Sequence, residues 1–137
     1  MIQINFVAVL LGALAIFIIG FLLHGPVLGQ LWMKLADIHP TGEEKFSSMV
    51  PNLVKNFIVN VVYTLAFSAV FSLAAPALGG RTAANAVKLV LIVWAGFLCP
   101  TTSIEVIWMK RKPSLWLFEV FASLVSSVAM ALIIAAF

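Results

Sequence analysis

Long apolar stretches alternate with short polar connections along this chain, and the alternation predicts its membrane topology. Four stretches are apolar and nearly free of charge, at residues 4–24, 53–78, 86–108 and 115–136. A bilayer core about 30 Å thick requires about 20 apolar helical residues, and each stretch is of that order. Transmembrane β-strands would be about half as long and would alternate in polarity. We therefore expect four membrane-spanning helices.

The composition agrees with this interpretation. Hydrophobic residues make up 64% of the chain and charged residues 9%, whereas a soluble domain has about 25% charged residues. So few polar side chains cannot cover the core of a water-soluble protein of this size. Because neither an internal repeat nor a low-complexity linker divides the chain, we expect one all-α domain over residues 1–137, a polytopic bundle of four transmembrane helices.

The connection between the first two spans has structure of its own. Gly25 and Pro26 should end the first helix. Residues 27–38 then carry apolar side chains at helical spacing, which predicts a short interfacial helix on the membrane surface. Thr41 and Glu44 have the spacing of a capping box, which predicts that a new helix starts there and leads to the second span.

The basic residues set the orientation, because cytoplasmic connections are enriched in Lys and Arg. The opposite side carries only Arg81 and Lys88. The connections after the first and third spans carry six basic residues: Lys34, Lys45, Lys55, Lys110, Arg111 and Lys112. We therefore expect a multi-pass protein of the plasma (inner) membrane with both termini outside the cytoplasm.

Small and hydroxyl-bearing residues recur at helical spacing within the spans. Such rows allow helices to approach closely and to bond across the contact. They predict the packing seams of a tight bundle, and a hydrophilic pathway is the alternative. Because the rows are more numerous than one four-helix monomer needs, they also predict a homo-oligomer or a larger membrane complex. The seam residues are Gly12, Gly20, Thr64, Ser68, Ser72, Ser123, Ser127 and Ala131.

Pro100 lies near the middle of the third span. It lacks an N–H group, so the carbonyl of Gly96 loses its helical partner and the helix should kink. Hydroxyls at residues 101–103 are available to satisfy the backbone. Broken helices form ligand sites in transporters, although kinks without a ligand are more common.

Two carboxylates within the spans are the first candidates for function, because an intramembrane carboxylate is usually paired, neutral or functional. Glu105 and Glu119 approach the same surface, since the short connection between their helices makes these antiparallel. His24, Asn56 and Asn60 reach a similar depth, so the five residues predict a polar layer. Either the carboxylates pair with Lys55, Lys110, Arg111 or Lys112, or the layer titrates a proton or binds a cation.

Other chemistry has no motif in this sequence. Two histidines and one cysteine match no metal-ligand spacing, and no nucleophile elbow or phosphate-binding loop is present. The basic residues at 110–112 lie beside a span, where they fit anionic lipid better than nucleic acid. We expect no enzyme activity, no metal and no cofactor, and we expect the lipid bilayer as the main partner.

Several segments resemble a known family. They are HGPVLGQLWMK after the first span, WAGFLCPTT in the third and LFEVFASLVSSVAMALII in the fourth. These are similar to a family of small prokaryotic four-helix membrane proteins that is classified as a domain of unknown function. The chain departs from that family's pattern at His24, where an aromatic residue is usual, and at Glu119, where Asn is usual. The resemblance implies the four-helix architecture and adds no activity.

The sequence thus favours a non-enzymatic, oligomerising or accessory membrane subunit that packs through its small-residue seams. The alternative is a small proton- or cation-coupled permease or exporter that uses Glu105 and Glu119.

Overall fold

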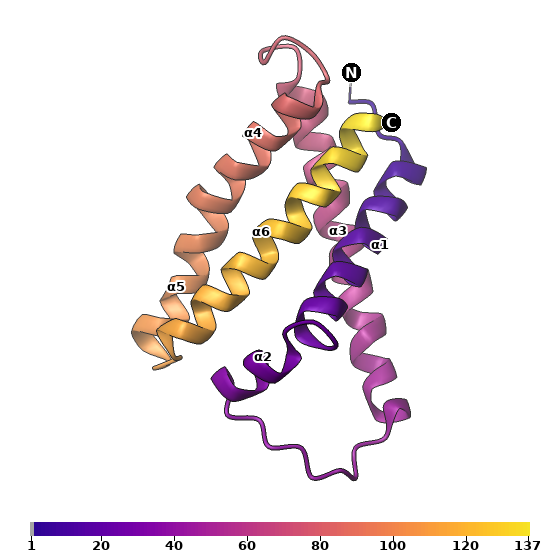
Figure 1. Ribbon diagram of the computed structural model, residues 1–137. Coiled ribbons are helices and arrows are strands. Elements are labelled where there is room, and N and C mark those ends of the chain that lie inside the picture. Colours follow the sequence, from indigo (N-terminus) through magenta and orange to yellow (C-terminus); the bar gives the residue numbers. More distant parts are fainter. Residues whose placement is uncertain (1) are drawn as a thin grey trace.

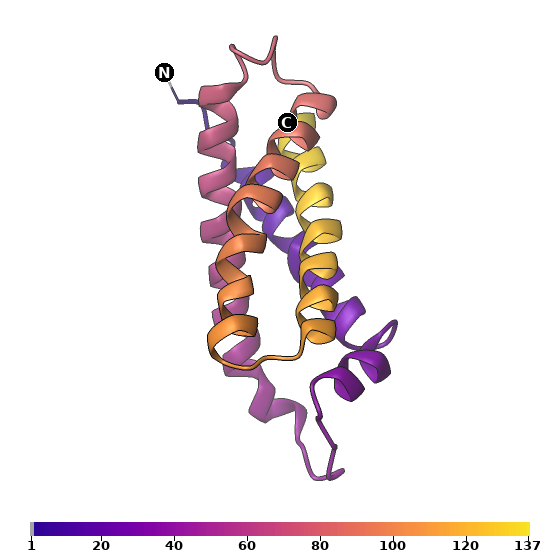
Figure 2. The same ribbon diagram turned by 90° about the vertical axis from the view of Figure 1, so that its left-hand side faces the viewer.

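The computed structural model describes residues 2–137, and these form a bundle of helices with no β-strand among them (Figures 1 and 2). A π-helical turn, η1, joins α4 to α5, so that the three segments make one continuous span. The elements in chain order are α1 (Phe6–His24), α2 (Gly29–Leu35), α3 (Phe46–Ala74), α4 (Ala83–Val93), η1 (Trp94–Leu98), α5 (Cys99–Trp108) and α6 (Pro113–Ala136).

Four helices are long and apolar enough to cross a membrane, namely Phe6–His24, Phe46–Ala74, Ala83–Trp108 and Pro113–Ala136. This confirms the all-α, four-span fold class. α1 begins and α6 ends at the same end of the bundle (Figure 1). The other end contains α2 and the connections at residues 25–45 and 109–112, and we call it the basic end because most of the Lys and Arg residues lie there.

The first helix ends at the predicted residue 24 and begins at Phe6, two residues after the predicted residue 4. The Asn5 side chain accepts hydrogen bonds from the N–H groups of Val7 and Ala8, at 3.0 and 3.2 Å, which caps the helix. α1 ends at His24, directly before Gly25. A Cβ atom at Gly25 would lie 2.8 Å from the carbonyl oxygen of Phe21, so only glycine allows the chain to turn back so tightly here.

The interfacial helix is shorter than the predicted residues 27–38, because α2 covers Gly29–Leu35. Asp37 adopts a left-handed conformation with φ of 55°, and the N–H of Ile38 donates to the carbonyl of Met33 at 2.9 Å. This is a Schellman turn, which ends a helix by satisfying its last carbonyls. The Lys112 ammonium group donates to the Asp37 carboxylate and lowers the pKa of that carboxyl, so α2 is also linked to the connection at residues 109–112.

The capping box at residues 41–44 was a wrong prediction. The Thr41 N–H and hydroxyl both donate to the Glu44 carboxylate, at 3.1 and 3.3 Å, but the next helix starts only at Phe46. Gly42 has a φ of +78°, which is not helical, so the four residues form a turn. α3 then begins before the predicted residue 53, includes Pro51, and ends at Ala74 before the predicted residue 78.

The break in the third span takes the form of the π-helical turn η1. Pro100 cannot donate to Gly96, and the chain widens over Trp94–Leu98, as helices do at π-bulges. The Thr102 hydroxyl donates to the carbonyl of Leu98 at 2.8 Å, and the Thr101 and Ser103 hydroxyls donate to other nearby carbonyls. The side-chain hydroxyls thus satisfy carbonyls next to Gly96. No atom lies within 4 Å of a Cβ atom built on Gly96, so packing does not require a glycine there.

The core lies where α1, α3 and α6 cross. A Cβ atom at Gly12 would lie 2.9 Å from Thr64 Cγ2 and 3.1 Å from Met130 Cγ, so the missing side chain allows the three helices to meet. Ser68, Ser127 and Ala131 are buried in the same region, and Ser72 accepts a hydrogen bond from the N–H of Gln3. Most predicted seams therefore pack helices of one chain against each other.

Two glycines on α1 provide a matched test of this packing. Gly12→Ala should lower the free energy of unfolding by about 1–3 kcal/mol, because the added methyl group overpacks the crossing. Gly20→Ala should leave it unchanged or raise it by up to about 1 kcal/mol, since no atom lies within 4 Å of its Cβ position. Titration with sodium dodecyl sulfate in mild detergent, followed by tryptophan fluorescence, measures both. Equal losses in the two variants would contradict the close approach at Gly12.

Candidate functional site

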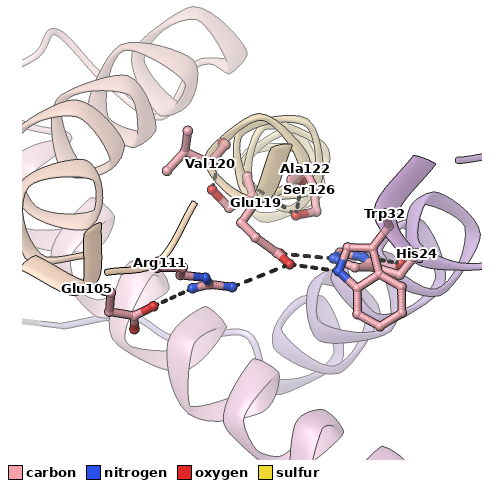
Figure 3. A network of polar contacts seen from close by, with 10 residues as sticks. His24, Trp32, Glu105, Arg111, Glu119, Val120, Ala122 and Ser126 are labelled. Carbon is pink, nitrogen blue, oxygen red and sulfur yellow. Dashed lines mark hydrogen bonds and ion pairs between the residues drawn. The ribbon is translucent and has the colours of Figure 1, made fainter. Parts of the chain in front are cut away.

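Side chains from three segments meet around Glu119 at the basic end of the bundle (Figure 3). His24, the last residue of α1, has its Nε2 atom 2.9 Å from Oε2 of Glu119. Trp32 of α2 donates its indole N–H to Oε1 of Glu119 at 3.0 Å. Glu119 lies on α6, and both of its oxygens are therefore engaged. The arrangement neutralises or satisfies a carboxylate that lies within a membrane-spanning helix.

The hydrogen bonds of His24 fix where its protons lie. Its Nδ1 atom is 2.8 Å from the carbonyl oxygen of Gly20, which can only accept, so Nδ1 carries a proton. The short contact between Nε2 and the Glu119 carboxylate then requires one proton between the two groups, on either the imidazole or the carboxyl. In both forms the pair has no net charge.

Arg111 joins the second carboxylate to this pair. Its guanidinium group donates to the Glu105 carboxylate, and its Nη2 atom lies 3.8 Å from Oε1 of Glu119. Glu105 thus reaches the cluster only through Arg111 (Figure 3). With the shared proton in place, the two carboxylates are balanced by Arg111 and that proton. Without it, the cluster carries one uncompensated negative charge.

A cavity of about 510 Å³ lies beside the His24–Glu119 pair, between α1, α3 and α6. Its apolar wall includes Phe17, Phe21 and Leu53, and Trp32 closes part of it. Asn56, Asn60, Ser123 and Ser126 provide polar groups on the same wall. The side chains of His24 and Glu119 each keep 29% of their surface exposed, which leaves both groups accessible from the cavity.

A second cavity, of about 340 Å³, lies on the other side of Glu119. Arg111, Thr102 and Trp116 line it, and Glu119 and Ser123 line both cavities. The Trp116 indole donates to the Thr102 hydroxyl at 3.0 Å. Glu119 and Ser123 of α6 are therefore shared by the walls of the two cavities.

The predicted polar layer is partly assembled. His24 and Glu119 bond directly, and Asn56 and Asn60 line the same cavity, but Glu105 is not part of its wall. Gly20 and Ser123, predicted as packing residues, also line this cavity.

Among the four basic residues considered as partners of the carboxylates, Arg111 is the one that pairs with them within residues 2–137. Sequence reasoning missed the role of Trp32. The signal that could have identified it is its position in the interfacial helix. The turn at Gly25 folds this helix back and brings Trp32 close to His24.

A metal site needs several ligand side chains close together. Within residues 2–137, no group of three or more His, Cys, Asp or Glu side chains could hold a metal ion.

Comparison with known proteins places the chain in a family without assigning an activity. No curated protein and no solved structure matches it. A family model described as "Protein of unknown function (DUF1761)" matches residues 7–135, which is nearly the whole chain. The match confirms the resemblance to a family that is classified as a domain of unknown function, and the chain belongs to this family.

Proposed function

We propose that this protein is a small, non-enzymatic, proton-linked permease of the cytoplasmic membrane. The observation that carries the proposal is the 2.9 Å contact between His24 Nε2 and Glu119 Oε2 in the wall of a cavity of about 510 Å³, from which we infer a shared proton. Cavities of about 300–1,000 Å³ with apolar walls and a few polar groups are typical of small-molecule sites. Here the polar groups include one that can gain or lose a proton.

Charge balance links the proton to the cavity's contents. Loss of the shared proton leaves one net negative charge inside the bilayer, and such a charge is costly unless another group compensates it. A ligand beside Glu119 therefore alters how tightly the proton is held, and by linkage the proton alters how tightly the ligand binds. A permease uses this reciprocity to drive one species with the gradient of the other.

The location of the cavity supports access from one side. It lies at the basic end of the bundle, and the positive-inside rule assigns that end to the cytoplasm. Both termini then lie outside. Glu105, which the sequence paired with Glu119 as a transport residue, has its charge matched by Arg111, and so His24 takes the place of Glu105 in the proposal.

Vesicles with a proton gradient test the proposal. The protein is reconstituted with phosphatidylethanolamine and phosphatidylglycerol, and a trapped pH dye reports proton movement on addition of benzyltrimethylammonium, benzenesulfonate or phenyl glucoside. At least one of these cationic, anionic and neutral probes should move protons. His24→Asn and Glu119→Gln should each reduce the rate at least about tenfold, since one of the two groups that share the proton is lost.

Matched variants make this result specific. Glu43→Gln removes an exposed carboxylate outside the spans and should leave the rate unchanged. Gly20→Leu should fold, because space is open around residue 20, and should abolish proton movement by filling the cavity. Absence of proton movement with all three probes, or equal rates in wild type, His24→Asn and Glu119→Gln, would contradict the proposal.

Assembly with other subunits is a second candidate function, and the third span favours it. Only 6% of its most apolar stretch is buried, against 44% in α6, because this span packs chiefly against α6. Ile92, Phe97 and Ile107 are among its exposed side chains. An oligomeric or accessory role would then use this face, since most of the small-residue seams are occupied within the chain.

Cysteine crosslinking in membranes tests the second candidate. In a Cys99→Ser background, Ile107→Cys should form a disulfide-linked dimer or a crosslink to another protein, whereas Leu10→Cys on exposed α1 serves as the control. Crosslinking at both positions to the same extent, or at neither, would contradict an interface on the third span.

A further inference from the structure

We propose that the cavity takes a monovalent organic cation with an apolar body, which binds in exchange for the proton shared by His24 and Glu119. This inference rests on the proposed function and names its substrate class.

The charges that face the His24–Glu119 pair come from a small set of groups. Arg111 and Glu105 balance each other, and Asp37 and Lys112 pair at the surface. The side chains that α3 contributes to the cavity are uncharged, including Asn56 and Asn60. Among the side chains that line the cavity, the His24–Glu119 pair is therefore the group whose charge is unbalanced when its proton leaves.

That unbalanced charge selects the ligand's charge. With the proton present, the pair is neutral, and an added cation would leave one excess positive charge beside Arg111. Without the proton, the pair carries one negative charge, which one monovalent cation restores to neutrality. An anion would meet a neutral pair in one state and a negatively charged pair in the other, so the pair compensates its charge in neither state. The exchange is balanced: protonated His24–Glu119 and a cation give the deprotonated pair with bound cation and one free proton.

The wall of the cavity fits the body of such a cation. Phe17, Phe21 and Trp32 contribute aromatic rings to the wall, and the faces of such rings attract cations. The side-chain carbonyl groups of Asn56 and Asn60 add acceptors. A small, strongly hydrated inorganic cation would gain little from the aromatic wall, whereas an organic cation with aromatic or aliphatic groups fills it.

Two probes of similar shape and opposite charge test the inference. Binding of tetraphenylphosphonium and tetraphenylborate to detergent-solubilised protein is measured by calorimetry, in buffers with different ionisation enthalpies, from pH 5 to 9. Tetraphenylphosphonium should bind with release of one proton, and its affinity should rise about tenfold per pH unit until the pair is deprotonated. Tetraphenylborate should not bind to the cavity. The Gly20→Leu protein, whose cavity is filled, measures the background partition of each probe into the micelle.

Two variants separate charge from protonation. His24→Asn should bind tetraphenylphosphonium without proton release and with little pH dependence, because Glu119 remains charged and no longer shares a proton with an imidazole. Glu119→Gln should weaken binding by at least about tenfold, since the compensating charge is lost. Binding of tetraphenylborate with equal affinity, or binding of tetraphenylphosphonium by wild type without proton release, would overturn the inference.

The vesicle experiment distinguishes this failure from failure of the proposed function. Benzenesulfonate or phenyl glucoside alone could drive proton movement that still depends on Glu119. That result would support the proposal of a proton-linked permease and reject the proposal of a cationic substrate. Proton movement with none of the probes would reject both.

Discussion

The structure of the basic end depends on one constraint, which is that a carboxylate at Glu119 lies within a membrane-spanning helix. An uncompensated charge there would cost several kcal/mol. The end of α1 supplies His24, α2 supplies Trp32 and the connection before α6 supplies Arg111. α1 and α2 are distant in sequence from α6, so satisfying one carboxylate also helps to fix how these helices lie relative to one another (Figure 3).

The same helix, α1, both packs the core and forms the cavity. At Gly12 it meets α3 and α6 so closely that a methyl group would clash, whereas at Gly20 nothing lies within reach of a Cβ atom. Tight packing in one half of the bundle holds the helices together, and the open half keeps space beside the His24–Glu119 pair. A stable core and a hollow polar end thus follow from one row of small residues.

The four spans and the end of α1 at His24 could be predicted because bilayer thickness, glycine and proline act locally on the sequence. The cluster could be predicted only in part. His24 and Glu119 were identified by their depth, but Trp32 was not, and Gly20 and Ser123, which were assigned to packing seams, line the cavity. Lipid and helix interfaces are similarly apolar, so the pattern of a span does not show which face packs inward. Thr41 and Glu44 failed as a capping box because Gly42 turns the chain.

One proton is shared between His24 and Glu119, and nitrogen-15 NMR of histidine-labelled protein in lipid tests this sharing most directly. The chain has two histidines, so in the His39→Gln variant every histidine signal comes from His24. We expect Nδ1 of His24 to be protonated at every pH between 5 and 9, and we expect Glu119→Gln to change the signal of its Nε2 atom. An unprotonated Nδ1, or an Nε2 signal identical in wild type and Glu119→Gln, would contradict the shared proton.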